Sequence, residues 1–198
     1  MPARLIPDDD AGRTEAIRVL RANGLVALPT DTVYGLAALP AAVERLFEAK
    51  QRPGEKRIVL LVDGLDQAAD LARPTPAAVA LAALWPGGLT LVLPGRDGST
   101  IAFRVPDHPT PRALARALGP MPTTSANRSG EPEARSAGEV LAALGDAIDL
   151  VLDGGPSPVG RPSTVVDCTG RRISILREGA VAASEIQAAL GEARTGAG

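Results

Sequence analysis

Short apolar runs of strand length alternate along this chain with segments whose apolar residues recur at helical spacing. The strand-like runs cover residues 25–28, 57–62, 90–93, 101–105, 149–153, 163–167 and 173–177. The helical patterns cover residues 11–24, 40–52, 75–85, 111–118, 136–144 and 184–190. Alternating strands and helices predict an α/β (α+β) fold built on a twisted sheet. Because some successive strands have no helix between them, we expect a mixed sheet flanked by helices.

Two sequence patterns predict where helices begin. Ser136 with Glu139, and Ser184 with Gln187, have the spacing of a capping box, in which the two side chains satisfy free N–H groups of the first turn. The 198 residues fit one domain. We therefore assign residues 1–193 to a single domain and residues 194–198 to a flexible tail.

Composition excludes several classes of protein. The single cysteine, Cys168, rules out an internal disulfide and a cysteine zinc cluster. The first residues lack the apolar core of a secretory signal, and no apolar run approaches the roughly 20 residues of a membrane helix. A formal net charge of −2 argues against a surface covered in nucleic-acid contacts. We expect a cytoplasmic protein that does not enter a membrane.

Familiar catalytic motifs are absent from the sequence. It contains no glycine-rich phosphate loop, no dinucleotide fingerprint, no H-E-x-x-H pair and no G-x-S-x-G elbow. The only histidine, His108, lies between prolines and is expected to hold a turn. Catalysis by a thiol or a histidine-activated serine is therefore disfavoured. We expect no metal bound by the protein alone, and Mg²⁺ only together with a phosphate substrate.

Polar residues gather instead at strand ends, beside glycine or proline. Five such clusters are present: "PTDTVYG" at 29–35, "KQRPGEKR" at 50–57, "TIAFRVP" at 100–106, "PTTSANRSG" at 122–130, and "GRPSTVVD" at 160–167 followed by "ILREG". Each cluster alone has a structural explanation, such as a turn, cations at a helix C-terminus, or an ion pair. Together they predict a basic cavity that positions a phosphoryl centre and stabilises its charge.

Arg104 interrupts an apolar strand and therefore needs a partner. That partner is either a carboxylate of the protein or the carboxylate of a ligand. We favour the ligand, because Pro106 follows and marks a strand end that a ligand can reach. On this hypothesis the guanidinium lacks an anionic partner in the empty protein, and Arg104→Met folds with little loss of stability.

Seven motifs, taken in order, resemble those of the YrdC-like threonylcarbamoyl-AMP synthases. They are "PTDTVYGL", "KQRP", "WPGGLTLVL", "FRVP", "TTSANRSG", "STVVD" and "LREG". The resemblance covers residues 25 to about 181. It implies a YrdC/RibB-like single domain with a concave basic cavity. It also implies a nucleotidyltransferase that makes L-threonylcarbamoyl-adenylate and pyrophosphate from L-threonine, bicarbonate and ATP.

The resemblance also implies roles for individual residues. Lys50 and Arg52 are the catalytic candidates. The threonine contacts are expected at Thr32, Arg104, Thr123 and Ser163. The ATP contacts are expected at Arg52, Lys56, Thr100, Ser125 and Arg177. A separate transferase complex would then pass the threonylcarbamoyl group to adenosine in tRNA, and a direct contact with tRNA or double-stranded RNA is a possible secondary property.

The chain departs from the family pattern at a few positions. Gly88 stands where a second proline is common, and Arg57-Ile58 follows Lys56 where proline and leucine are common. Leu61 replaces a histidine that some members use to touch threonine. Glu133 falls where an ATP-contacting serine or threonine is usual, and its carboxylate would repel phosphate. The chain is also too short for the second domain that some members carry.

Two other functions compete with the synthase hypothesis. One is an RNA-binding module of the same fold without catalysis, which the basic loop supports. The negative net charge and the scarcity of aromatic residues count against it, because stacking platforms for single-stranded bases use aromatic side chains. The other is a carbamoyl transferase module that uses carbamoyl phosphate.

The basic loop generates a first prediction. Replacing Arg52 or Lys56 with alanine should weaken ATP binding far more than threonine binding, because the loss of a charge-assisted hydrogen bond costs about 1.5–3 kcal/mol. Calorimetric titration of each folded variant with ATP and with threonine measures the two affinities. An unchanged ATP affinity would refute the phosphate role of these side chains.

Overall fold

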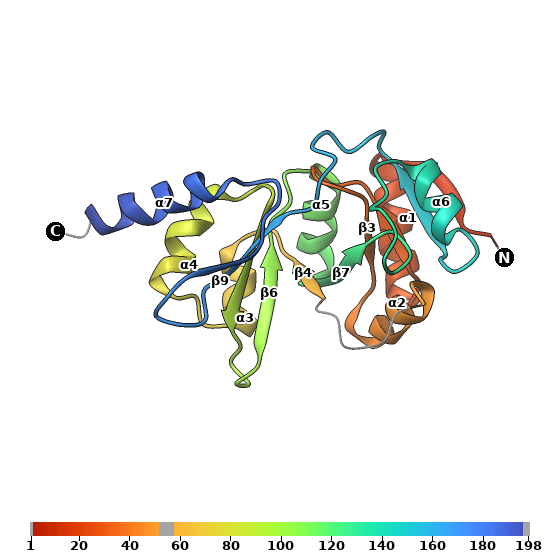
Figure 1. The fold of residues 1–198 in the computed structure, drawn as a ribbon. Helices are drawn as coiled ribbons and strands as arrows, with labels where there is room; N and C mark the ends of the chain where they lie inside the picture. The colour runs from red at the N-terminus through yellow and green to blue at the C-terminus, as the bar shows by residue number, and fades with distance from the viewer. Residues whose placement is uncertain (1, 52–57, 196–198) are drawn as a thin grey trace.

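One sheet of ten strands runs through the described part of the chain, residues 2–51 and 58–195 of a computed structural model (Figure 1). The strands are β1 (Arg4–Pro7), β2 (Val26–Leu28), β3 (Gly35–Ala37), β4 (Val59–Leu61), β5 (Leu89–Pro94), β6 (Thr100–Arg104), β7 (Met121–Ser125), β8 (Leu150–Asp153), β9 (Thr164–Asp167) and β10 (Ser174–Arg177). Their order across the sheet is β1-β8-β2-β3-β7-β4-β6-β5-β9-β10.

The sheet is mixed, as predicted. β8 runs parallel to both β1 and β2, and the pairs β4–β6 and β5–β9 are also parallel. The remaining neighbours are antiparallel, and β5–β6 is a direct hairpin. The α/β class expected from the sequence is therefore confirmed.

Helices cover both faces of the sheet. They are α1 (Asp10–Arg21), α2 (Val43–Ala49), α3 (Leu65–Leu71), α4 (Pro76–Leu81), α5 (Pro109–Leu118), α6 (Ala137–Leu144) and α7 (Ala183–Thr195), with 3₁₀ turns at Pro40–Ala42 and Ala82–Leu84. In Figure 1, α1, α2 and α6 lie toward one end of the molecule, and α3, α4 and α7 lie toward the other. None of the helices in the described ranges has the length and apolar content that crossing a membrane requires.

Strands β2 and β8 are buried on both faces. In β2, Ala27 packs in the core beneath α2 and α6, whereas Val26 and Leu28 pack in the core beneath α1 and α5. β8 divides its side chains in the same way. Because alternate side chains of a strand point to opposite faces, a continuous apolar run is what such a doubly covered strand requires. A third core lies among α3, α4, α7 and strands β5, β6 and β9.

Some predicted boundaries were wrong. The pattern at 40–52 gives a 3₁₀ turn and then α2, which ends at Ala49 with Lys50 as its C-cap. The capping box at Ser184 and Gln187 does not form, because α7 begins at Ala183. Glu185 supplies the cap instead, and its carboxylate accepts the N–H of Ala182 at 2.8 Å.

The apolar run at 57–62 was expected to be buried on both faces. Val59 and Leu60 of β4 are only partly buried, and Leu61 is fully buried. Val59 and Leu61 line a cavity in the middle of the sheet. The run is apolar because it forms part of a cavity wall as well as part of the core.

Two glycines give a stability prediction. A Cβ on Gly179 would lie 2.4 Å from the carbonyl oxygen of Pro162 and 2.5 Å from that of Ser163, so alanine there must move backbone. We expect Gly179→Ala to destabilise the protein by about 1–3 kcal/mol, as overpacking does. Gly138 lies in α6 and a Cβ there would meet only the Ser136 hydroxyl oxygen, at 4.0 Å, so Gly138→Ala should stabilise by about 0.5–1 kcal/mol.

Urea unfolding of both variants and the wild type measures these changes. Both substitutions add one methyl group. Changes of opposite sign in the free energy of unfolding would therefore reflect the different backbone contacts at the two positions. Equal effects of the two substitutions would contradict the packing described for Gly179.

Candidate active site

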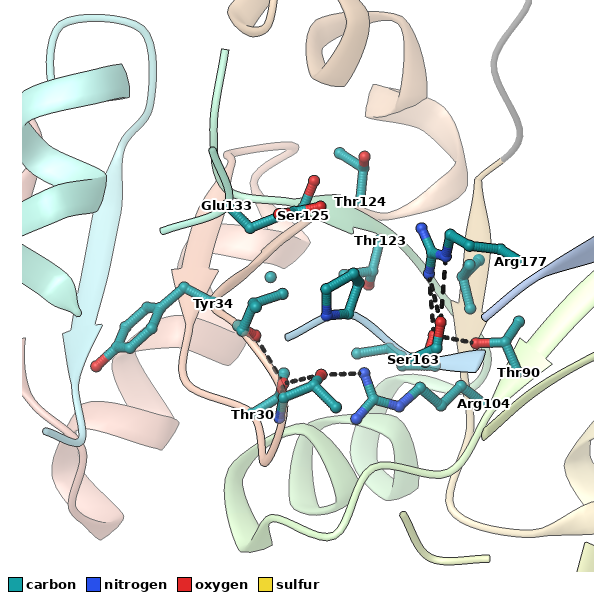
Figure 2. A pocket seen from close by; sticks show the side chains of 16 residues that line it. Thr30, Tyr34, Thr90, Arg104, Thr123, Thr124, Ser125, Glu133, Ser163 and Arg177 are labelled. Atoms are coloured by element: carbon teal, nitrogen blue, oxygen red, sulfur yellow. Dashed lines mark hydrogen bonds between the residues drawn. The ribbon is translucent and has the colours of Figure 1, made fainter. Parts of the chain in front are cut away.

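A cavity of about 170 Å³ opens where β3, β4, β6 and β7 meet the loops that precede β3 and β9 (Figure 2). Its wall is rich in hydroxyl groups, and a smaller apolar part is formed by Val33, Val59 and Leu61. The hydroxyl-bearing residues are Thr30, Thr32, Thr90, Thr123, Thr124, Ser125 and Ser163. Arg104 and Arg177 also line it, as does Glu133. Such a surface suits a small, polar and charged molecule better than an apolar one.

The turn between β2 and β3 is organised by its own threonines. The Thr30 hydroxyl donates to the carbonyl of Val33 at 2.7 Å and accepts the N–H of Thr32 at 3.1 Å. The hydroxyl groups of Thr30 and Thr32 lie 3.1 Å apart. Side-chain bonds of this kind replace strand hydrogen bonds and fix a tight turn. The turn holds the Thr32 hydroxyl at the cavity without help from a ligand.

Arg104 forms a buried ion pair with Asp31. Its Nη2 lies 2.5 Å from Oδ1 of Asp31, and the two side chains are only 8% and 10% exposed. Nη1 donates to the Thr32 hydroxyl at 2.6 Å, and Nε donates to the carbonyl of Gly87 at 3.0 Å. The expectation that Arg104 lacks an anionic partner in the empty protein is therefore wrong. A guanidinium this deeply buried needs a counter-ion from the protein itself.

The ion pair leaves part of Arg104 for a ligand. Burial lowers the pKa of the Arg104 guanidinium, the negative charge of Asp31 opposes that change, and nearby Arg177 adds to it. The group remains protonated, as arginine does in proteins. The three hydrogen bonds to the protein use three of its five N–H groups, so two remain for an anion.

Ser163, which also lines the cavity, is held by hydrogen bonds to Thr90 and Arg177. Its hydroxyl lies 2.8 Å from the Thr90 hydroxyl, and its carbonyl accepts Nε and Nη2 of Arg177 at 3.1 and 2.8 Å. Arg177 forms no ion pair with the described residues. Burial lowers the pKa of Arg177, and the carboxylate of Glu133 acts in the opposite direction. Arg177 therefore brings to the cavity a positive charge that no ion pair in this part of the chain neutralises.

Lys50 lies just outside the cavity wall and braces it. Its Nζ donates to the carbonyl of Ser125 and, at 3.2 Å, to Oδ1 of Asn127. The residue is 2% exposed. Lys50 thus fixes the end of β7 and adds positive charge behind Ser125.

Tyr34 joins three loops that surround the cavity. Its hydroxyl donates to the carbonyl of Gly155 at 2.7 Å and accepts the N–H of Gly154 at 3.3 Å. Its backbone N–H donates to the carbonyl of Ala134, and its carbonyl accepts the N–H of Ala126. Figure 2 shows its ring pointing away from the cavity. The only tyrosine of the chain therefore anchors the site and does not face a ligand.

The structure brings most of the predicted site residues together. Those that line the cavity are Thr32, Arg104, Thr123, Ser125, Ser163 and Arg177, with Lys50 directly behind Ser125. Thr123 and Ser125, expected at a strand end, lie within β7. Arg52 and Lys56 lie outside the described residues.

Thr100 is not part of this cavity. It is exposed at the start of β6, whereas Arg104 ends that strand, and four steps along the strand separate them by about 13 Å. Thr90 was missed, because it was read only as part of a strand. A single hydroxyl inside the apolar run of β5 is the signal that could have identified it.

The amino-acid sequence of this chain is similar to those of a known protein family. The Sua5/YciO/YrdC family, described as telomere recombination, matches residues 18–179. A Bacillus subtilis protein named threonylcarbamoyl-AMP synthase is 37% identical over 92% of this chain and 58% of its own length. A Mycobacterium tuberculosis protein named putative threonylcarbamoyl-AMP synthase is 36% identical over 91% of this chain and 89% of its own length.

Solved structures agree with these sequence relatives. The crystal structure of Pyrococcus abyssi Sua5 complexed with L-threonine has a TM-score of 0.87 and 33% identity. The match covers 96% of this chain and 61% of that one. The crystal structure of Escherichia coli YciO has a TM-score of 0.79 and 28% identity, over 89% of this chain and 96% of that one. This chain therefore spans about three fifths of the longer relatives and nearly all of the shorter ones.

The buried ion pair gives the next prediction. We expect Arg104→Met to lower the free energy of unfolding by about 3–5 kcal/mol, because the Asp31 carboxylate stays buried without its cation. Asp31→Asn should cost a similar amount, because it leaves the guanidinium without a counter-ion. The double variant should lose less than the sum of the single losses, since neither charge is then left unpaired.

Urea denaturation of the four proteins completes this double-mutant cycle. Arg104→Met with wild-type stability would contradict a structural role for the pair. Strict additivity of the two single losses would show that the two side chains are not coupled.

Proposed function

Because the chain belongs to the Sua5/YciO/YrdC family, we propose that it is a threonylcarbamoyl-AMP synthase. Such an enzyme joins L-threonine, bicarbonate and ATP into L-threonylcarbamoyl-adenylate and releases pyrophosphate, which makes it a nucleotidyltransferase. The observation that carries the proposal is the convergence of Arg104, Thr32, Ser163 and Arg177 on one hydroxyl-lined cavity. That convergence supports a site for an amino acid next to a phosphate group.

The arrangement of charges suits the proposed reactants. Threonine carries a carboxylate, and the remaining N–H groups of Arg104, which Asp31 already fixes in place, can donate hydrogen bonds to it. Hydroxyl groups of Thr32 and Ser163 can bond the polar parts of the same molecule. The apolar surfaces of Val59 and Leu61 can pack against its methyl group.

The reaction brings several anions together. The amine of threonine combines with bicarbonate to form a carbamate, with loss of water. A carbamate oxygen then attacks the α-phosphorus of ATP, and the bond to pyrophosphate breaks. Arg177 and Lys50 can offset the negative charge that builds up as these groups approach, and Arg52 and Lys56 remain the expected ATP contacts of the basic loop.

Magnesium belongs to the substrate in this proposal. The described residues contain no group of three or more His, Cys, Asp or Glu side chains that could hold a metal ion. Glu133 is the one carboxylate among the described residues of the cavity wall. Mg²⁺ would therefore enter with ATP and neutralise its phosphates, as it does in other phosphoryl-transfer sites.

The wider role follows from the proposed product. L-Threonylcarbamoyl-adenylate is an activated acyl donor, so we propose that a separate transferase complex in the cytoplasm uses it to modify adenosine in tRNA. The alternative of an RNA-binding module without catalysis is not favoured, because the polar groups converge on a small cavity and the formal net charge is −2. A direct contact with tRNA or double-stranded RNA would be secondary to the chemistry.

The proposal predicts a strict substrate requirement. Pyrophosphate release from ATP should require both threonine and bicarbonate, and mass spectrometry should detect the adenylate. Serine should give a lower kcat/KM, because the missing methyl group forfeits about 1 kcal/mol of packing. Equal pyrophosphate release without threonine would reject the proposed function, and equal kcat/KM for the two amino acids would reject the methyl contact.

A further inference from the structure

Glu133 presents a carboxylate to a cavity in which the other charged side chains of the described wall are cations. Its segment follows β7 and leads into α6, and it is fixed on both sides of Glu133. Before Glu133, the side-chain amide of Asn127 donates to the carbonyl of Glu131 at 2.7 Å; after it, the carbonyl of Ala134 accepts the N–H of Tyr34 at 2.8 Å. Glu133 is therefore held at the wall by its neighbours and not by its own side chain.

The carboxylate of Glu133 makes no hydrogen bond or ion pair with residues 2–51 or 58–195. Asp31 differs in this respect, because its Oδ1 accepts both Nη2 of Arg104 and the N–H of Asp107. Glu133 does act at longer range on Arg177, whose pKa it raises. The cavity thus holds one anionic side chain that has no structural partner in the described chain.

The proposed reactants contain one organic cation that a carboxylate would attract. The carboxylate of threonine, bicarbonate and the phosphates of ATP are all negative, and Glu133 would repel each of them. The α-ammonium of threonine is the exception, because it is positive and carries three N–H donors. Figure 2 shows Glu133 on the side of the cavity that carries Ser125 and Thr124, across from Arg104. An amino acid lying between them could place its ammonium group near Glu133 and its carboxylate near Arg104.

We propose that Glu133 binds the α-ammonium group of the amino-acid substrate, while Arg104 binds its carboxylate. This inference rests on the proposed function, because it takes threonine as the substrate. It assigns Glu133 the role of a binding residue that orients the amine toward bicarbonate. The two side chains together would select α-amino acids and reject molecules that have only a carboxylate.

The reaction changes the charge that Glu133 meets. The ammonium loses its protons as the carbamate forms, so the attraction exists in the bound substrate and disappears before the α-phosphorus is attacked. An interaction of this kind lowers KM without raising kcat. The kinetic signature of losing the Glu133 carboxylate is therefore a rise in KM for threonine without a fall in kcat.

The direct test measures binding of threonine alone, without nucleotide, Mg²⁺ or bicarbonate. The proteins are the wild type, Glu133→Gln and the control Glu131→Gln, in which an exposed carboxylate of the same loop is neutralised. The second ligand is 2,3-dihydroxybutanoate, which has a hydroxyl group in place of the amine. Calorimetry then gives six dissociation constants, and steady-state assays add KM and kcat for the same three proteins.

We expect Glu133→Gln to weaken threonine binding by about tenfold or more, as the loss of a charge-assisted bond does. Its KM for threonine should rise in parallel. Binding of the hydroxy acid should not weaken in Glu133→Gln, because the lost carboxylate repels this anion, and Glu131→Gln should match the wild type.

Several results would overturn the inference. One is unchanged threonine binding by Glu133→Gln, and another is an equal loss of affinity for both ligands. A third is a change in the affinity for Mg²⁺-ATP alone, which would show that Glu133 acts on the nucleotide. Threonine binding by the wild type together with any of these results rejects the role of Glu133 and leaves the proposed function standing. A wild-type protein that neither binds threonine nor releases pyrophosphate rejects the proposed function and this inference with it.

Discussion

The ion pair between Arg104 and Asp31 is the contact on which the geometry of the site depends. It joins the end of β6 to the turn between β2 and β3, two segments that lie far apart in the sequence. Buried charges of opposite sign need each other, because neither can be hydrated. The pair therefore sets the position of the Thr32 hydroxyl and leaves the remaining N–H groups of the guanidinium in place before any ligand arrives. A group that is already oriented need not be ordered when the ligand binds.

Hydroxyl groups provide much of the remaining order around the cavity. Thr30 closes its own turn, Thr90 holds Ser163, and Tyr34 ties down the loop at Gly154 and Gly155. These groups form neutral hydrogen bonds that cost less to bury than charges do. They let the wall remain polar while Arg104, Arg177 and Glu133 carry its charge. A site for small charged molecules can then exist inside a fold whose cores are aliphatic.

The sequence predicted the class of fold and several of the side chains that line the cavity, but not each contact. Strand patterns and Gly/Pro positions are local, so β5, β6, β8, β9 and β10 were found close to their observed bounds. The partner of Arg104 was mistaken, because Asp31 belongs to another motif and only the folded sheet brings the two together. Thr100 lies at the other end of β6 from Arg104 and outside the cavity, so its expected contact with ATP stays a prediction. Pairwise contacts between distant segments are not visible in local patterns.

The pairing of β1 with β8 also governs how the chain must fold. β1, residues 4–7, pairs in parallel with β8, residues 150–153, and with no other strand of the described chain. It therefore gains its sheet neighbour only after most of the chain has been synthesised. Closing such a long loop costs chain entropy before any contact is gained, which slows folding. The cavity draws on residues from Thr30 to Arg177 and is complete only when the last strand, β10, has joined the sheet. A ligand that fills it therefore binds only chains in which these segments have assembled, and its affinity adds to the free energy that holds β10 in the sheet.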